Sequence, residues 1–184
     1  MMLNRLVGWD RRDPLTPNFN FFGSVCERAK ESLFLDVFRL RYEVYCRECR
    51  FLDAADYPDG LESDAYDASA YHVAARNEAD QIVGTVRLVF ADAAGRFPFE
   101  DHCTTFADFT FPPRAECAEV SRLVVSKGYR RRPGDTMQGV SKNFVEKGRP
   151  DAIPIDPDDP EGKHRRRISP QILKGMFRQI YLHS

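Results

Sequence analysis

The segment Ala-Glu-Val-Ser-Arg-Leu-Val-Val, residues 118 to 125, constrains the fold of this chain more than any other. Its apolar and β-branched residues predict a buried β-strand, although it also carries a carboxylate and a guanidinium. Ionised groups on a buried strand are costly unless they are paired. Because Glu119 and Arg122 are three positions apart, they fall on opposite faces of a regular strand, and each requires its own partner. Two polar sites on one apolar strand indicate a reaction cleft.

Partners of suitable charge lie upstream in apolar or tightly turned contexts. Arg41 falls in a helix-like run, a D-x-Y-D cluster occupies residues 64 to 67, and Arg87 interrupts the strand-like run 82–90. With the pair on the strand, these residues make three arginines and three carboxylates. The numbers allow a closed ion-pair network, and a purely structural ion cluster is the alternative interpretation.

The order of apolar periods predicts one domain that follows an N-terminal arm over residues 1–20. The expected elements are a strand at 21–29, a helix at 31–48, a hairpin of strands 70–76 and 82–90, a strand at 117–126, a flexible charged loop at 127–167 and a helix at 169–183. Ser169 and Pro170 are typical of the first positions of a helix.

The helix predicted at 31–48 has an aromatic face that also carries Arg41. Its spacing places Phe34, Phe38, Arg41, Tyr45 and Glu48 in one line, so Arg41 points inward. Alternatively, the stem of Arg41 packs while its charged head reaches water. For the acidic cluster, the alternative to ion pairing is that Asp64 and Asp67 cap the next element.

Three further features have structural interpretations. The loop 91–116 holds five phenylalanines, which suit either core filling or the rim of an acyl pocket. His72 lies in a strand and is interpreted as a packed histidine. Cys46 and Cys49 have a spacing that also occurs in zinc and redox sites, but no second Cys-x-x-Cys follows, so we predict packed thiols and no metal site.

Taken in order along the chain, these residues resemble the acyl-homoserine-lactone (autoinducer) synthases and the related long-chain N-acyl amino acid synthases. The resemblance rests on Arg41, Tyr45, Phe51, Asp64, Asp67, Arg87, Glu119 and Arg122. The run from Leu40 to Cys46 is most similar to acyltransferases associated with PEP-CTERM/exosortase systems. Tyr45 and Phe51 stand where the lactone synthases usually have Phe and Trp, which favours acylation of an amine over lactone formation on S-adenosylmethionine.

The resemblance implies an α/β (α+β) fold of the GNAT acyltransferase type, with a mixed, splayed sheet flanked by helices over residues 21–184. Such a domain normally continues with further strands after the helix at 169–183. We therefore expect a fragmentary form that lacks the C-terminal strands, has an incomplete acyl pocket and shows little activity alone. The other hypothesis is a non-catalytic protein that keeps the fold for binding.

The expected reaction moves a fatty acyl group from a thioester to the amine of an amino acid or similar small molecule. We assign Glu119, as proton acceptor, and Arg122 to catalysis. Backbone N–H groups around Val124 are expected to stabilise the oxyanion. The resemblance assigns substrate binding and its support to Arg41, Tyr45, Phe51, Asp64, Asp67 and Arg87.

Basic charge is concentrated in the predicted loop. Residues 127–167 contain eleven Lys or Arg against seven Asp or Glu, a net of +4. A solvated loop is one interpretation. The other is docking of acidic acyl carrier protein by Arg130, Arg131 and Arg132. The sequence from Arg131 to Thr136 has only the first half of the R-x-x-G-x-G/A turn that binds coenzyme A, so carrier protein is the expected donor and acyl-CoA the second choice.

Composition excludes several other classes. With 42% hydrophobic residues and a net charge of −1, the 184-residue chain is long enough for a core and has no general affinity for nucleic acid. No apolar run approaches the length of a membrane span, and the N-terminus lacks the apolar core of a signal peptide. We expect a cytoplasmic protein with reduced thiols and no permanently bound cofactor.

Overall fold

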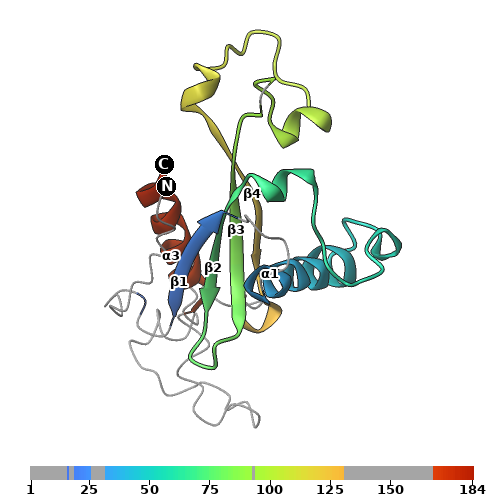
Figure 1. Ribbon diagram of the computed structural model, residues 1–184, viewed down its shortest axis with the longest axis vertical. Coiled ribbons are helices and arrows are strands. Elements are labelled where there is room, and N and C mark those ends of the chain that lie inside the picture. Colours follow the sequence, from blue (N-terminus) through green and yellow to red (C-terminus); the bar gives the residue numbers. More distant parts are fainter. Residues whose placement is uncertain (1–15, 17–18, 26–31, 93, 131–167) are drawn as a thin grey trace, which may run out of the picture.

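A computed structural model describes residues 16, 19–25, 32–92, 94–130 and 168–184 (Figure 1). It contains one antiparallel sheet in the order β1-β2-β3-β4. The strands are β1 (Asn20–Val25), β2 (Tyr71–Arg76), β3 (Ile82–Phe90) and β4 (Ala118–Val125). The predicted hairpin and the polar strand are therefore present. Among these four strands all pairing is antiparallel, so no mixed pairing occurs in the described part of the sheet.

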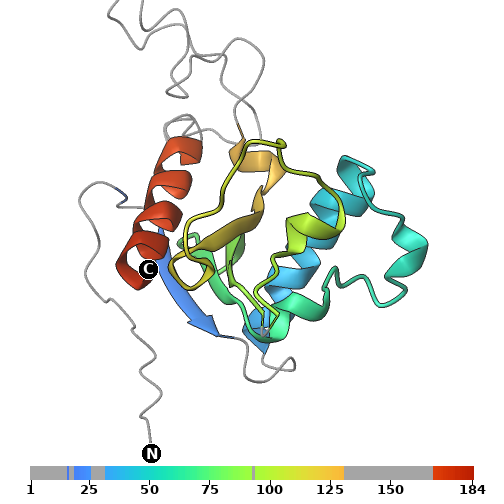
Figure 2. The same ribbon diagram turned by 90° about the horizontal axis from the view of Figure 1, so that it is seen from above.

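Helices cover both faces of the sheet (Figure 2). On one face, α1 (Ser32–Tyr42) buries Phe34, Val37 and Phe38 against Ala74 of β2. On the other face lies α3 (Ile168–His183), whose apolar residues recur every four positions and pack on β1, β2 and β3. The sequence predicted both helices from this apolar periodicity.

The helix α3 approaches the sheet closely because one glycine of the sheet and one glycine of the helix lie at their contact. A Cβ atom on Gly84 of β3 would lie 2.7 Å from a methyl group of Ile172, and one on Gly175 of α3 would lie 2.1 Å from the ring of Phe21. Both distances are shorter than carbon atoms tolerate in contact. Any larger side chain at these positions would push α3 away from the sheet.

The first helix does not continue as an α-helix to residue 48, which corrects the sequence prediction. At Glu43 it widens into a π-helix, η1 (Glu43–Glu48), in which the Cys49 N–H donates to the Val44 carbonyl oxygen at 2.9 Å. Arg50, with a φ of 54°, ends the turn. One wider turn shifts every later side chain around the axis.

The strand β4 contains a bulge, which corrects the expectation of a regular strand. Thr85 pairs with Val124 and Arg87 pairs with Ser121, so two steps along β3 match three steps along β4. The extra residue falls at Arg122, whose φ is 53°. Bulges bend a strand and change the direction of its side chains. Because of this bulge, Arg122 turns toward the α1 side of the sheet, where Arg87 also lies.

Short 3-10 turns shape the connections. The loop after η1 contains η2 (Ala54–Asp56) and η3 (Ala65–Ala68), and η6 (Lys127–Tyr129) follows β4. Between β3 and β4 the chain forms η4 (Pro98–Asp101) and η5 (Arg114–Glu116), and this segment projects beyond the end of the sheet (Figure 1). It carries the cluster of phenylalanines.

Candidate active site

Six side chains form a closed ring of alternating charge on the α1 side of the sheet. The ring runs in the order Arg41, Glu62, Arg122, Asp64, Arg87 and Asp67, and then returns to Arg41. Each carboxylate bridges two arginines, and each arginine contacts two carboxylates. Three positive and three negative charges balance, so the ring as a whole is neutral.

Arg41 forms the buried side of the ring. Its NH1 lies 2.7 Å from Asp67 Oδ1 and its NH2 lies 3.1 Å from Asp67 Oδ2, while its Nε donates to Glu62 Oε2. The side chains of Arg41 and Glu62 have no exposed surface. Two parallel hydrogen bonds to one carboxylate are the strongest arrangement that a guanidinium makes. The expectation of an inward, paired Arg41 is confirmed, and its charged head does not reach water.

The other side of the ring is open to solvent. Asp64 accepts from Arg87 NH1 at 2.5 Å and from Arg122 NH2 at 2.9 Å, and Arg122 Nε donates to Glu62 at 3.0 Å. The side chains of Arg122 and Asp64 are 28% and 26% exposed, whereas that of Arg87 is 1% exposed. Solvent therefore reaches the ring at Arg122 and Asp64.

The pKa shifts show that ion pairing outweighs burial. Burial alone would raise the pKa of Asp67, but Arg41 and Arg87 lower it to about 2. Burial would also lower the pKa of Arg41, yet its contacts with Asp67 and Glu62 raise it above the ordinary value. The same balance, with Asp64 and Asp67 as partners, raises the pKa of Arg87. These shifts favour the charged forms of Arg41, Asp67 and Arg87.

The acidic cluster caps η3 and also belongs to the ring, so both interpretations of its sequence hold. Asp64 accepts from the Tyr66 N–H at 3.0 Å, and Asp67 accepts from the Asp64 N–H at 2.8 Å. This capping box fixes both carboxylates on a short turn. The same two carboxylates also accept hydrogen bonds from the arginines of the ring.

Glu62 takes the place in the ring that the sequence suggested for Glu119. Its backbone N–H donates to the Phe38 carbonyl oxygen at 3.1 Å, which holds the loop against the end of α1. One weak signal for this residue is present in the sequence, namely a third acid two positions before the D-x-Y-D cluster. Sequence reasoning missed it because a loop glutamate is usually solvated.

The ring also holds the bulge of β4 in place. A non-glycine residue with a positive φ carries strain of about 1 to 3 kcal/mol and persists only where its surroundings fix it. Arg122 is such a residue, with a φ of 53°, and its two ion pairs with Glu62 and Asp64 provide that fixation. Arg87 Nε adds a hydrogen bond to Ser121 Oγ at 3.2 Å, beside the bulge.

Tyr45 lies beside the open side of the ring, and Phe51 lies next to Tyr45, with their ring centroids 6.5 Å apart. The Tyr45 hydroxyl donates to the Leu123 carbonyl oxygen at 3.3 Å, and the Arg122 guanidinium lies 5.9 Å from the centre of the Tyr45 ring. Burial raises the pKa of Tyr45, although Arg122 and Arg41 oppose the shift. Phe51 is 74% exposed and lines a separate hollow of ≈ 610 Å³ beside η1.

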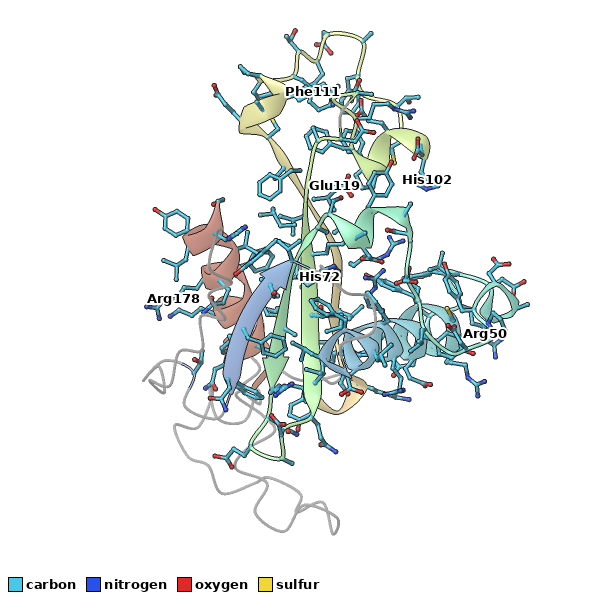
Figure 3. All side chains as sticks on the ribbon, viewed as in Figure 1. Arg50, His72, His102, Phe111, Glu119 and Arg178 are labelled. Atoms are coloured by element: carbon cyan, nitrogen blue, oxygen red, sulfur yellow. The ribbon has the colours of Figure 1, made fainter. Side chains whose placement is uncertain are left out.

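Glu119 lies outside the ring, which corrects the expectation that an arginine holds it. Its Oε2 accepts from the Phe99 N–H at 2.9 Å, and it lines a cavity of ≈ 250 Å³ in the projecting segment. Figure 3 shows Glu119 between that segment, marked by Phe111, and the sheet, marked by His72. Within the described residues it forms no ion pair with Arg87 or Arg122. Val124 is buried beside the bulge and pairs with Thr85.

The residues predicted to dock a carrier protein lie mostly outside the described residues. Arg130 is described and forms an ion pair with Glu48 at the end of η1. Arg131 and Arg132 fall outside the described ranges, as does most of the predicted charged loop. The pairing with Glu48 joins the start of that loop to the helix that carries Arg41 and Tyr45.

The remaining candidates have structural surroundings. His72 is buried between the rings of Phe34 and Phe38, and its Nε2 donates to the Asp67 carbonyl oxygen at 2.9 Å. Cys46 is buried and Cys49 is half-buried, both as free thiols. The described residues contain no group of three or more His, Cys, Asp or Glu placed to hold a metal. None of the described helices has the length and apolarity needed to cross a membrane.

Comparison with known proteins agrees with this architecture. Residues 40–139 match the acetyltransferase (GNAT) domain family, and this match covers more than half of the chain. The protein therefore belongs to the GNAT family, and the expected GNAT-like fold is confirmed. The matched residues include all six members of the charged ring and Glu119.

Two crystal structures also align with part of the chain. TofI, in a ternary complex with an inhibitor and MTA, is 22% identical over 57% of this chain and 56% of its own, with a TM-score of 0.45. The AHL synthase LasI is 20% identical over 60% of this chain and 53% of its own, with a TM-score of 0.37. The chain thus spans about half of either structure. No curated protein matches the sequence.

Proposed function

We propose that this protein is an N-acyltransferase that moves a fatty acyl group from a thioester to the amine of an amino acid or similar small molecule. The observation that carries the proposal is the contrast between the two charges of β4. Arg122 is neutralised by Glu62 and Asp64, whereas Glu119 has no arginine partner among the described residues. A half-buried carboxylate without a counter-ion is suited to accept a proton.

In the proposed reaction the Glu119 carboxylate takes a proton from the substrate ammonium, directly or through a water, and the free amine attacks the thioester carbonyl carbon. The new C–N bond forms as the C–S bond breaks, the thiol leaves with a proton, and one further proton is released to solvent. Proton acceptance of this kind accelerates reactions by about 10² to 10⁴-fold.

The bulge supplies the second part of the proposed mechanism. A bulge leaves backbone groups outside the regular ladder, so N–H groups between Leu123 and Val125 are candidates to bind the developing oxyanion. In this proposal the ion-pair ring is positioning machinery. The ring fixes the position of Arg122, and Arg122 in turn fixes the neighbouring backbone, which is proposed to contact the thioester.

For the donor we propose acyl carrier protein, with acyl-CoA as the second choice. The support comes from the sequence: three consecutive arginines begin at Arg130, and the coenzyme A turn is incomplete. A PEP-CTERM/exosortase association and N-acyl amino acid products remain proposals that rest on the resemblance in sequence.

The test is direct. The purified chain is incubated with acyl carrier protein or coenzyme A loaded with fatty acids of several lengths, and with a panel of amines that includes all twenty amino acids. Because the chain alone is expected to show little activity, the incubations are long and use a high protein concentration. We expect a low yield of a new N-acyl amine by mass spectrometry, with one equivalent of free thiol for each N-acyl amine formed. Absence of product with every donor, from protein whose folding is verified by circular dichroism, would support the non-catalytic binding hypothesis.

A further inference from the structure

The projecting segment between β3 and β4 and the start of β4 line an aromatic cavity that is open to solvent and has a single carboxylate among its lining residues. The cavity has a volume of ≈ 250 Å³, and its lining consists of Phe97, Phe99, Phe109, Phe111, Pro112, Cys117, Ala118 and Glu119. This volume corresponds to about eight water-sized groups. A small molecule with one aromatic ring or a branched apolar side chain fits it.

The charged side chains around the cavity determine whether it favours a cationic or an anionic ligand. Glu100, the nearby acid on η4, is neutralised by Arg114 through hydrogen bonds of 2.8 and 2.9 Å. Glu119 receives only the Phe99 N–H, which leaves its negative charge uncompensated among the described residues. An ammonium group at the mouth of the cavity would complete the pair.

The phenylalanines favour a cation as well. The faces of aromatic rings are negative and attract cations. The Phe111 ring already holds a cation in this way, because the guanidinium of Arg114 lies 3.8 Å from the centre of that ring. The rings of Phe109 and Phe111 meet edge to face, with centroids 4.8 Å apart, and form a fixed aromatic corner.

We propose that this cavity binds the amine substrate, and that the substrate is a primary ammonium compound with an aromatic or branched apolar side chain. The side chain occupies the phenylalanine cluster and the ammonium group lies at Glu119. The inference rests on the proposed function for its biological meaning. It is tested without an acyl donor, so binding and acyl transfer succeed or fail separately.

Cys117 provides a readout inside the cavity, and the exposed Cys103 provides an internal control. The protein is treated with iodoacetamide, and peptide mass spectrometry follows alkylation of each thiol with three probes. 2-Phenylethylamine carries the ring and the ammonium group, 3-phenylpropanoate carries the ring and a carboxylate, and ethanolamine carries the ammonium group alone. We expect only 2-phenylethylamine to slow alkylation of Cys117, with no effect on Cys103.

Three variants distinguish the contribution of the Glu119 charge to protection of Cys117 from the contribution of the Phe109 ring. Glu119→Gln should weaken protection by about tenfold or more, because it removes a charge-assisted contact. Glu116→Gln, an exposed acid that does not line the cavity, should leave it unchanged. Phe109→Leu keeps an apolar side chain, loses the ring and changes a residue that is 51% exposed, so the fold should survive while protection weakens.

Equal protection by 3-phenylpropanoate, or full protection in Glu119→Gln, would overturn the inference. Acyl transfer to polar amines without any protection of Cys117 would also overturn it, and would leave the proposed function intact. Protection of Cys117 without acyl transfer to any amine would retain the site and refute the enzyme.

Discussion

The Tyr45 hydroxyl donates to the Leu123 carbonyl oxygen at 3.3 Å, and this contact joins the π-helical turn η1 to the bulge of β4. Two irregular elements therefore meet at one hydrogen bond. A π-helical turn and a bulge each redirect a side chain or a carbonyl group, and both occur frequently at functional sites. In this protein they lie beside Arg122, on the open side of the charged ring.

Loss of that hydroxyl should reduce turnover more than stability. Tyr45→Phe removes one neutral hydrogen bond, so we expect a loss of about 1 kcal/mol in the free energy of unfolding. A larger relative loss in kcat is expected because the bulge carries the proposed oxyanion donors. Tyr66→Phe is the matched control, since its hydroxyl donates to Asp101 at 3.0 Å, far along the chain from the bulge. Equal kcat values in the two variants would contradict this role.

The buried arginines should be essential for folding. Arg41→Met leaves Glu62 and Asp67 each with one arginine, and unpairing buried charges costs about 3 to 5 kcal/mol. Arg39→Met is the control on the same helix, because its ion pair with Asp36 is more than half exposed and should contribute less than about 1 kcal/mol. Chemical denaturation measures both values. Similar stability of the two variants would show that the ring does not hold the fold.

Two glutamates should separate structure from chemistry. Glu62→Gln breaks the ring at a side chain with no exposed surface and should lower the melting temperature strongly. Glu119→Gln still accepts the Phe99 N–H, so we expect a melting temperature within about 4 °C of the wild type and a turnover lower by about 10² to 10⁴-fold. Calorimetry and acyl-transfer assays check both. Full activity in Glu119→Gln would remove that residue from the mechanism.

Stability should fall with acid in two pH ranges. Burial lowers the pKa of His72 below its usual 6.5, so the unfolded chain binds that proton first and stability decreases as the pH drops below that value. The pKa of Asp67 is lowered from 3.8 to about 2, so its contribution is present above the unfolded value and is lost as the pH falls toward about 2. Denaturation midpoints across both ranges test this. Burial also lowers the pKa of His183, so His72→Gln should reduce the upper decrease without removing it and should leave the lower one unchanged. An upper decrease of unchanged size in that variant would assign it to another group.

Docking of a carrier protein should depend on the basic start of the charged loop. Reversal of charge at Arg130, Arg131 and Arg132 should raise KM for acyl carrier protein and reduce its salt dependence, with little effect on stability. The ion pair between Arg130 and Glu48 adds a second test. Glu48→Gln releases Arg130 and should lower KM modestly. An unchanged KM in the triple variant would make the loop a solvated surface.

Local patterns predicted much of this fold. The apolar period placed α1 and α3, the turn residues placed the β2–β3 hairpin, and three arginines in apolar contexts correctly indicated a charged network. Glu62 was missed because its burial depends on a loop that folds back on α1 at Phe38. The bulge was missed because it arises from register between strands, and no property of residues 118 to 125 alone reveals it. The π-helical turn was missed because the spacing of its apolar residues matches that of an α-helix to within one residue.

The ring of alternating charge also has a kinetic consequence. Arg122 meets Glu62 across 60 residues of sequence and Asp64 across 58, whereas the β2–β3 hairpin closes a short turn. Contacts between distant segments carry the larger entropy cost of loop closure and form late in folding. Interactions that are absent from the transition state act mainly on the unfolding rate. We expect the ring to set how long the native protein survives between openings, while the hairpin and the helices set how fast it folds.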